Sequence, residues 1–254
     1  MKNAEIAALG LDKGWRTTCC ILLGQEIGGL EVCRSYLAEM VKRPLVAHSA
    51  SGKEVRLAQP YYCEKAPFIA LEELSGNAPA LDINQIKDID SLLSSLKERL
   101  QYCGNNNIGI SSAVEDSDSC IDSVCVKDSL QIMKSKNVAY SYGIRQGENV
   151  YGSMWCGDVS FCIRCHGLFH SGRCFESYLS INSHGLFFSF NCRNCNEALF
   201  SFNQASKQYL VGNLALPKEK YTALKGKLLA EVAEKLAKEG RFPSLFGLVG
   251  EKNG

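Results

Sequence analysis

Two pairs of cysteines with metal-ligand spacing are the residues best suited to chemistry in this sequence. Each pair is a Cys-x-x-Cys motif, and 26 residues separate the two motifs, whose cysteines are Cys162, Cys165, Cys192 and Cys195. Two such pairs can supply the four thiolates of a tetrahedral zinc site, and a zinc site contributes directly to the free energy of folding. Zinc is therefore the one cofactor that the spacing suggests.

Residues between the two motifs could also bind the metal, so the spacing does not fix the four ligands. A second hypothesis explains the cysteines without zinc. Side chains that could replace a thiolate there are His166, His170, Cys174 and His184. Alternatively, the cysteines form a reduced structural ladder, because a free thiol behaves as a small hydrophobe in a narrow core. We favour the ladder and keep the zinc site as the alternative.

Catalytic chemistry has less support in the sequence. A histidine can activate a nearby thiolate, and Cys162 lies close to His166 and His170, but no nucleophile elbow or oxyanion loop accompanies them. Glycoside hydrolysis needs two carboxylates on either side of a groove. No paired-acid motif occurs between Val126 and Gly212. The sequence predicts no catalytic residue and favours a non-enzymatic protein.

Composition and charge limit the class of protein. Apolar residues make up 46% of the 254 residues and charged residues 22%, which is typical of a folded globular protein. The net charge of +1 predicts neither a nucleic-acid nor a membrane-surface partner. No stretch reaches the roughly 18 uninterrupted apolar residues of a membrane span. We predict a cytoplasmic protein whose thirteen cysteines are reduced, because most cytosols keep thiols reduced.

The cysteine pairs lie in a segment that reads as many short strands. From Ser135 onward, short apolar or aromatic groups recur every nine to twelve residues, and Val138, Val150 and Val159 each follow an Asn or Asp. Such spacing fits an antiparallel sandwich or barrel, or a parallel β-solenoid. The Asn, Ser, Gly and Cys content favours the solenoid. We predict a right-handed parallel β-solenoid over 105–214, with about four coils of roughly 20–30 residues each.

Helices are expected on both sides of this segment. Residues 1–45 have apolar positions at helical spacing, 45–75 read as strands and loops, and 82–103 form an amphipathic helix expected to pack on a neighbouring layer. These elements predict a small N-terminal domain over 1–104, mixed α/β or mostly helical. The fold class is therefore α+β.

The C-terminal region, 215–254, is predicted to cap the solenoid. A helix should begin near Pro217, because proline suits the first turn, and it should end at Gly240. The apolar tail after it, 242–248, is expected either to pack back on the domain or to bind a partner.

The region from about 115 to 248 carries a further pattern. Strand units rich in Asn, Ser, Cys and Tyr precede a Tyr-x-x-x-Asn segment, a helix and a Phe-Pro tail; matching positions are Tyr209, Asn213, Lys218, Glu219 and Tyr221, and differing positions are Leu214, Pro217 and Lys220. In this region the chain resembles uncharacterised, Cys-rich β-solenoid proteins of candidate-phyla bacteria and archaea. The resemblance implies a solenoid fold and no particular activity.

Two functional hypotheses follow from the sequence. The open coil edges of a solenoid and the apolar tail favour a scaffold or binding module that acts through a protein partner or as a homo-oligomer. The alternative is a zinc-stabilised, Cys-rich protein with a ligand-binding or thiol redox role.

Overall fold

The computed structural model describes residues 3–250 except 42–43, 59–66, 75–79, 148–149, 158, 161, 169–171, 179, 181 and 183. Four helical segments open the chain: α1 (Asn3–Leu23), η1 (Leu30–Cys33), α2 (Arg34–Leu37) and η2 (Ala38–Met40). Next come β1 (Leu45–His48), β2 (Glu54–Leu57), β3 (Phe68–Ala70), η3 (Leu71–Glu73), η4 (Ile83–Gln85), α3 (Ile89–Lys97) and β4 (Tyr102–Gly104).

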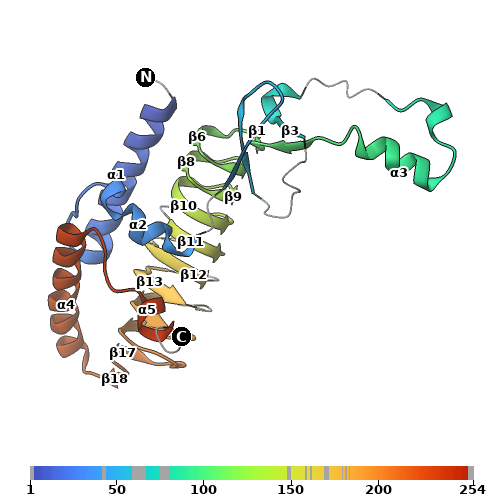
Figure 1. Ribbon diagram of the computed structural model, residues 1–254. Coiled ribbons are helices and arrows are strands. Elements are labelled where there is room, and N and C mark those ends of the chain that lie inside the picture. The colour runs from blue at the N-terminus through green and yellow to red at the C-terminus, as the bar shows by residue number, and fades with distance from the viewer. Residues whose placement is uncertain are drawn as a thin grey trace.

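The strands of the solenoid follow, and two helices end the chain (Figure 1). The strands are β5 (Asn107–Ile108), β6 (Ser112–Glu115), β7 (Asp118–Ile121), β8 (Val124–Lys127), β9 (Leu130–Met133), β10 (Lys136–Ile144), β11 (Tyr151–Cys156), β12 (Arg164–Leu168), β13 (Glu176–Tyr178), β14 (His184–Phe187), β15 (Ser189–Phe190), β16 (Asn196–Leu199), β17 (Gln208–Val211) and β18 (Leu214–Ala215). The helices are α4 (Lys218–Glu239) and α5 (Leu245–Gly250).

Strand register confirms the parallel β-solenoid and corrects its coil length. Paired residues are twelve apart from β6 to β17, as in Ala139 with Tyr151 and Ser177 with Ser189. Each coil therefore has twelve residues, and 107–211 make about eight turns. The expected four coils of 20–30 residues were wrong, because that estimate assigned two or three of the recurring nine-to-twelve-residue units to each coil, whereas one such unit is a whole coil.

Each coil turns at every third residue. The backbone takes left-handed φ angles at Ala113, Asp116, Ser119 and Asp122, and this period continues through most of the described coils. Such angles cost L-residues energy, although Asn, Asp and Gly tolerate them better. Asn137 has φ +58° and directly precedes the inward-facing Val138. The Asn-Val pattern of the sequence therefore marks a corner followed by a core position.

A second core lies between one outer face of the solenoid and the helices. The outer face carries a column of side chains twelve residues apart: Ala139, Tyr151, Ile163, Phe175, Phe187 and Leu199. Helix α1 lies against β6, β8 and β10, η2 lies against β11, and α4 lies against α1 and β17 (Figure 1). Residues 3–41, predicted to belong to a separate N-terminal domain, thus share their core with the coils.

Short strands cover the two ends of the solenoid. The antiparallel pair β1–β2 lies at the first coil, where the buried Asp118 carboxylate accepts hydrogen bonds from the N–H groups of Ala58 and Asn106, both at 2.7 Å. At the other end, β18 pairs antiparallel with β17. The predicted C-terminal helix is confirmed as α4, which starts after Pro217 and ends at Gly240.

The predicted helix over 82–103 differs most from the expectation. Only Ile89–Lys97 is α-helical, because Asp88 caps that helix while Asp82 caps the separate turn η4. Helix α3 buries no residue and projects away from the solenoid, so it does not pack on a neighbouring layer (Figure 1). None of the helices in the described ranges has the length and apolar character needed to cross a membrane.

Candidate functional site

Inward side chains stack in columns along the solenoid axis. One column is almost entirely serine: Ser117, Ser129, Ser141, Ser153, Cys165, Ser177, Ser189 and Ser201, all buried. The Ser129 hydroxyl donates to the Lys127 carbonyl at 2.7 Å and accepts from the Ser141 N–H at 3.1 Å. Hydroxyls such as that of Ser129 thus link one coil to the next and are satisfied without water.

The four cysteines predicted as metal ligands occupy positions in these columns. Cys165 stands in the serine column, while Cys162 continues an apolar column that contains Val126, Val138 and Val150. The other pair lies two and a half coils later in an equivalent arrangement. Cys192 continues the column that contains Cys156, and Cys195 continues the column that contains Ser135. The Cys-x-x-Cys spacing therefore equals the three-residue distance between successive inward positions.

The structure brings the cysteines together within each pair but separates the two pairs. Cys162 and Cys165 share a cluster with Cys156 and Cys174, whereas Cys192 and Cys195 pack with the aliphatic side chains of another cluster. Two and a half coils correspond to about 12 Å at the usual strand spacing, whereas sulfurs bound to one zinc lie within about 4.6 Å of each other. Within the described ranges, no three His, Cys, Asp or Glu residues are placed to hold a metal ion.

Burial opposes thiolate chemistry at Cys192 and Cys165. It raises the pKa of Cys192 to about 11, and together with neighbouring thiols it raises the pKa of Cys165 well above its ordinary value. At Cys162, burial acts in the same direction, but hydrogen bonds with Cys165 and Cys174 outweigh it and hold the pKa below its ordinary value. Any negative charge in this cluster is therefore concentrated at the Cys162 sulfur, away from solvent.

The columns predict which cysteine substitutions are tolerated. We expect Cys165→Ser and Cys162→Val to change the free energy of unfolding by less than about 1 kcal/mol, because each residue then matches its column. The crossed changes, Cys162→Ser and Cys165→Val, should each cost about 1–3 kcal/mol, because a hydroxyl enters an apolar column or a carbonyl loses its donor. Urea denaturation measures both sets.

Metal analysis of the same variants separates the ladder from the zinc hypothesis. The protein is purified without tag or chelator, and its zinc content is measured by mass spectrometry. A ladder predicts that EDTA leaves the thermal midpoint unchanged. Stoichiometric zinc that disappears in Cys165→Ser would contradict the ladder and restore the zinc site.

Of the other predicted ligands, Cys174 lies in the thiol cluster, His184 is exposed on β14, the His166 side chain is not described, and His170 lies outside the described residues.

A buried pair of opposite charges joins the helices to the coils. Arg164 and Glu176 are both fully buried. The Arg164 guanidinium lies 2.9 Å from the Glu39 carboxylate and 4.4 Å from the centre of the Tyr36 ring. Glu176 accepts hydrogen bonds from the Tyr36 hydroxyl at 2.8 Å and from the Leu245 N–H at 2.7 Å. This pair therefore connects three separate parts of the chain.

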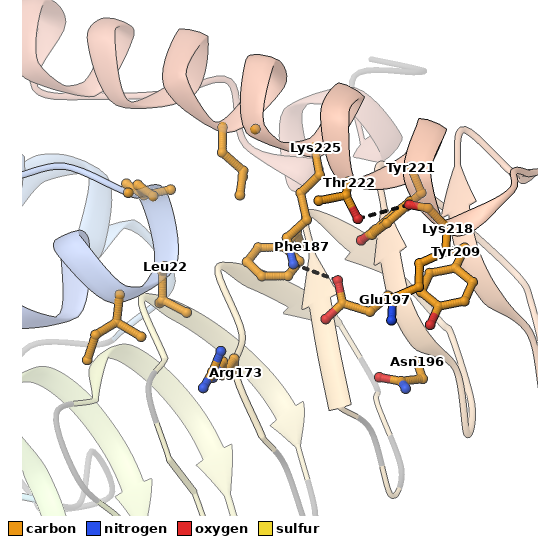
Figure 2. A pocket seen from close by; sticks show the side chains of 15 residues that line it. Leu22, Arg173, Phe187, Asn196, Glu197, Tyr209, Lys218, Tyr221, Thr222 and Lys225 are labelled. Carbon is orange, nitrogen blue, oxygen red and sulfur yellow. Dashed lines mark hydrogen bonds and ion pairs between the residues drawn. The ribbon is translucent and has the colours of Figure 1, made fainter.

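A pocket with converging polar groups, which we call the seam pocket, lies where α1, α4 and the last coils meet. Its volume is about 650 Å³. Its lining is Ile21, Leu22, Leu23, Gly24, Arg173, Phe187, Asn196, Glu197, Tyr209, Lys218, Tyr221, Thr222, Lys225, Gly226 and Leu229. Figure 2 shows Lys218, Tyr221 and Lys225 extending from α4 toward the coil that carries Asn196 and Glu197. A pocket of this size suits a small-molecule ligand.

Polar groups in the seam pocket are partly paired. Lys225 donates to the Glu197 carboxylate at 2.6 Å, and its ammonium lies 4.0 Å from the centre of the Phe187 ring. The Tyr221 hydroxyl is buried and forms no close hydrogen bond, although it lies near the Glu197 carboxylate. Burial, followed by the charge of Glu197 and hydrogen bonding toward that carboxylate, raises the pKa of Tyr221, so this hydroxyl stays protonated and can donate.

Sequence reasoning missed this pocket and the buried charge pair. Their residues come from the two ends of the chain and from coils several turns apart, and no local motif connects them. A signal was nevertheless present: Arg164 and Glu176 are opposite charges at equivalent positions of successive coils, twelve residues apart, and Lys225 lies on the apolar side of an amphipathic helix. Comparisons of the chain with protein families, curated proteins and solved structures return no match.

Proposed function

We propose that this chain is a binding module whose solenoid is a rigid support for a projecting arm, residues 71–74 and 80–101, that binds a protein partner. The observation that carries the proposal is the exposure of apolar side chains on the arm. Exposed fractions are 76% for Ile83, 64% for Ile89, 56% for Leu93 and 64% for Leu100. Clustered apolar side chains exposed to this degree mark an interaction site.

The geometry of the arm supports this role. Strands β3 and β4 pair in parallel, Phe68 with Tyr102, so both ends of the arm are fixed beside the first coil. Helix α3 has only nine residues. Helices shorter than about 12–15 residues are marginal alone in water, so an apolar stripe on such a helix gains stability when it packs against another surface.

Charge indicates the chemistry of the partner. Acidic residues outnumber basic ones on the arm by six to three: Glu72, Glu73, Asp82, Asp88, Asp90 and Glu98 against Lys87, Lys97 and Arg99. A matching partner would present an apolar groove rimmed by Lys or Arg, into which an amphipathic helix inserts. We therefore commit to a protein with a basic-rimmed apolar groove as the occupant.

A pair of substitutions on α3 tests the proposal. A photo-reactive residue at Ser94 identifies the partner in cells by crosslinking, and the purified partner is then titrated against the full chain. We expect Ile89→Ser with Leu93→Ser to weaken binding at least about tenfold, because two apolar anchors are lost. Stability should be unchanged, because neither side chain is buried. The control, Lys227→Met on α4, should bind like the wild type.

Two outcomes would contradict the proposal. A partner whose affinity is insensitive to the double substitution would bind elsewhere on the chain. A dimer in light scattering that the double substitution dissolves would make a second copy of this chain the occupant instead.

The proposal includes a reducing cytoplasmic compartment. All twelve cysteines that the structure describes are free thiols, and Cys63 lies outside the described residues. Free thiols at this density are typical of compartments that keep cysteine reduced. Mass spectrometry of the native protein after rapid alkylation should find unpaired thiols, and disulfides among buried cysteines would contradict this assignment.

A further inference from the structure

We propose that the seam pocket binds a small organic anion that has one carboxylate or phosphate group and an apolar body. The inference is independent of the arm, which lies at the other end of the solenoid (Figure 1).

Charge in the seam pocket favours an anion. Three cationic side chains line it, Arg173, Lys218 and Lys225, against the single carboxylate of Glu197. Glu197 is paired with Lys225, whereas neither Arg173 nor Lys218 forms a salt bridge with a described residue. Two positive charges are therefore left for a ligand.

The Tyr221 hydroxyl is a second and independent sign of a ligand. Tyr221 is only 1% exposed and lines the pocket, and its hydroxyl forms no close hydrogen bond, although it lies near the Glu197 carboxylate. A buried hydroxyl without a partner costs stability, so such groups in native proteins normally have a role. A protonated phenol beside an anionic oxygen would recover this hydrogen bond.

Helix α4 adds to the field in the pocket. Its first residue is Lys218, and its N-cap, Pro217, supplies no side-chain hydrogen bond to the free N–H groups of the first turn. The N-terminal end of a helix attracts anions, and Glu219 in the same turn offsets only part of this charge. The N-terminal end of α4 therefore adds to the preference for an anion that Arg173 and Lys218 already give the pocket.

The opposite wall of the pocket is apolar. The last turn of α1 contributes Ile21, Leu22 and Leu23, and α4 contributes Leu229. Inorganic phosphate would leave this wall in contact with water. A ligand with an aromatic or aliphatic body would cover it, and a volume of about 650 Å³ accommodates such a body.

Titration of the full chain with phenyl phosphate, followed by calorimetry and NMR, tests the inference. Inorganic phosphate and phenol are the two matched probes, because each has one half of the ligand. We expect phenyl phosphate to saturate one site and to bind at least about tenfold more tightly than either half, because each half adds its own contacts.

Single substitutions assign the site. We expect Arg173→Met and Lys218→Met each to weaken phenyl phosphate about tenfold or more, as loss of a charge-assisted hydrogen bond does. Tyr221→Phe keeps the ring and should weaken binding about threefold to tenfold. Lys227→Met, an exposed residue of α4 outside the pocket, is the control and should leave affinity unchanged. Thermal denaturation of each variant confirms folding.

Four results would overturn the inference. These are no saturable binding of phenyl phosphate, equal affinity for phenyl phosphate and inorganic phosphate, equal affinity for phenyl phosphate and phenol, and equal weakening by Lys218→Met and Lys227→Met. Equal affinity for inorganic phosphate would show that the apolar body is not recognised. Equal affinity for phenol would show that the anionic group is not recognised. Equal weakening by the two lysine substitutions would show that binding depends only on nonspecific charge.

Discussion

Replacement of Arg164 by methionine is expected to lower the free energy of unfolding by about 3–5 kcal/mol at neutral pH. Arg164 and Glu176 are both fully buried, and Arg164 is the cation that acts on the Glu176 carboxylate. Methionine fills similar volume but leaves Glu176 as a buried charge without compensation. The hydrogen bonds from Tyr36 and from the Leu245 N–H then offset only part of its desolvation.

The loss should depend on pH in a defined direction. Burial raises the pKa of Glu176 above its ordinary value, and Arg164 opposes that rise, so methionine at position 164 raises this pKa further. A carboxyl whose folded-state pKa is raised contributes its full stability below the unfolded-state pKa and loses it as the pH rises through the folded-state pKa. The cost of Arg164→Met should therefore be smallest in acid and grow toward neutral pH.

Urea denaturation across the acid-to-neutral range measures this effect. The added change Glu176→Gln removes the titrating group while an amide oxygen still accepts from Tyr36, so we expect the double variant to lose the pH dependence. Arg193→Met, at an exposed coil position, is the matched control and should change stability by less than about 0.5 kcal/mol. An equal loss from Arg164→Met at every pH would show that packing, and not charge, explains the effect.

A second large effect is expected at Gly152. Its φ is +62°, and a Cβ atom there would lie 2.4 Å from the carbonyl oxygen of Leu37, in the segment that packs on β11. Gly152→Ala should cost about 3 kcal/mol, since it combines left-handed strain with a backbone clash that cannot relax without moving α2 and η2.

Gly212→Ala separates the two contributions. Gly212 also has a positive φ, +54°, but nothing lies within 4 Å of a Cβ added there. We expect a loss of only about 1 kcal/mol, from the backbone conformation alone. Thermal and urea denaturation of both variants give the comparison. Equal losses would mean that the contact between Leu37 and the coil contributes nothing beyond strain.

The solenoid was predictable from the sequence, but its period was not recognised. The recurring Asn-Val pattern predicts the solenoid. Asn tolerates the left-handed φ angles of the corners, and the residue after each corner enters the core. The coil length was overestimated because two or three recurring units were assigned to each coil, whereas one unit is a whole coil. Serine at every sixth position from Ser111 to Ser141, with an apolar residue midway, contains the twelve-residue period.

The sites could be predicted only in part for a related reason. Cys162 and Cys165 were correctly placed in the coils, and their spacing was a consequence of the triplet geometry. Contacts of Arg164 with Tyr36 and Glu39 depend on how the helices lie on the outer face, which no local pattern specifies. The apolar tail packs back on the coils, as expected, since the Phe242 and Phe188 rings lie 5.1 Å apart.

The constant register also restricts how this chain can change in length. Insertion or deletion of a number of residues that is not a multiple of six displaces serines and apolar residues from their columns. A six-residue change keeps these columns in the first coils but turns the outer column of the following coils away from the helices. A whole duplicated coil keeps all columns in place. The separation between the arm and the seam pocket can therefore grow or shrink only in discrete steps of about 4.8 Å. The distance between the two proposed binding sites is thus set by the number of coils.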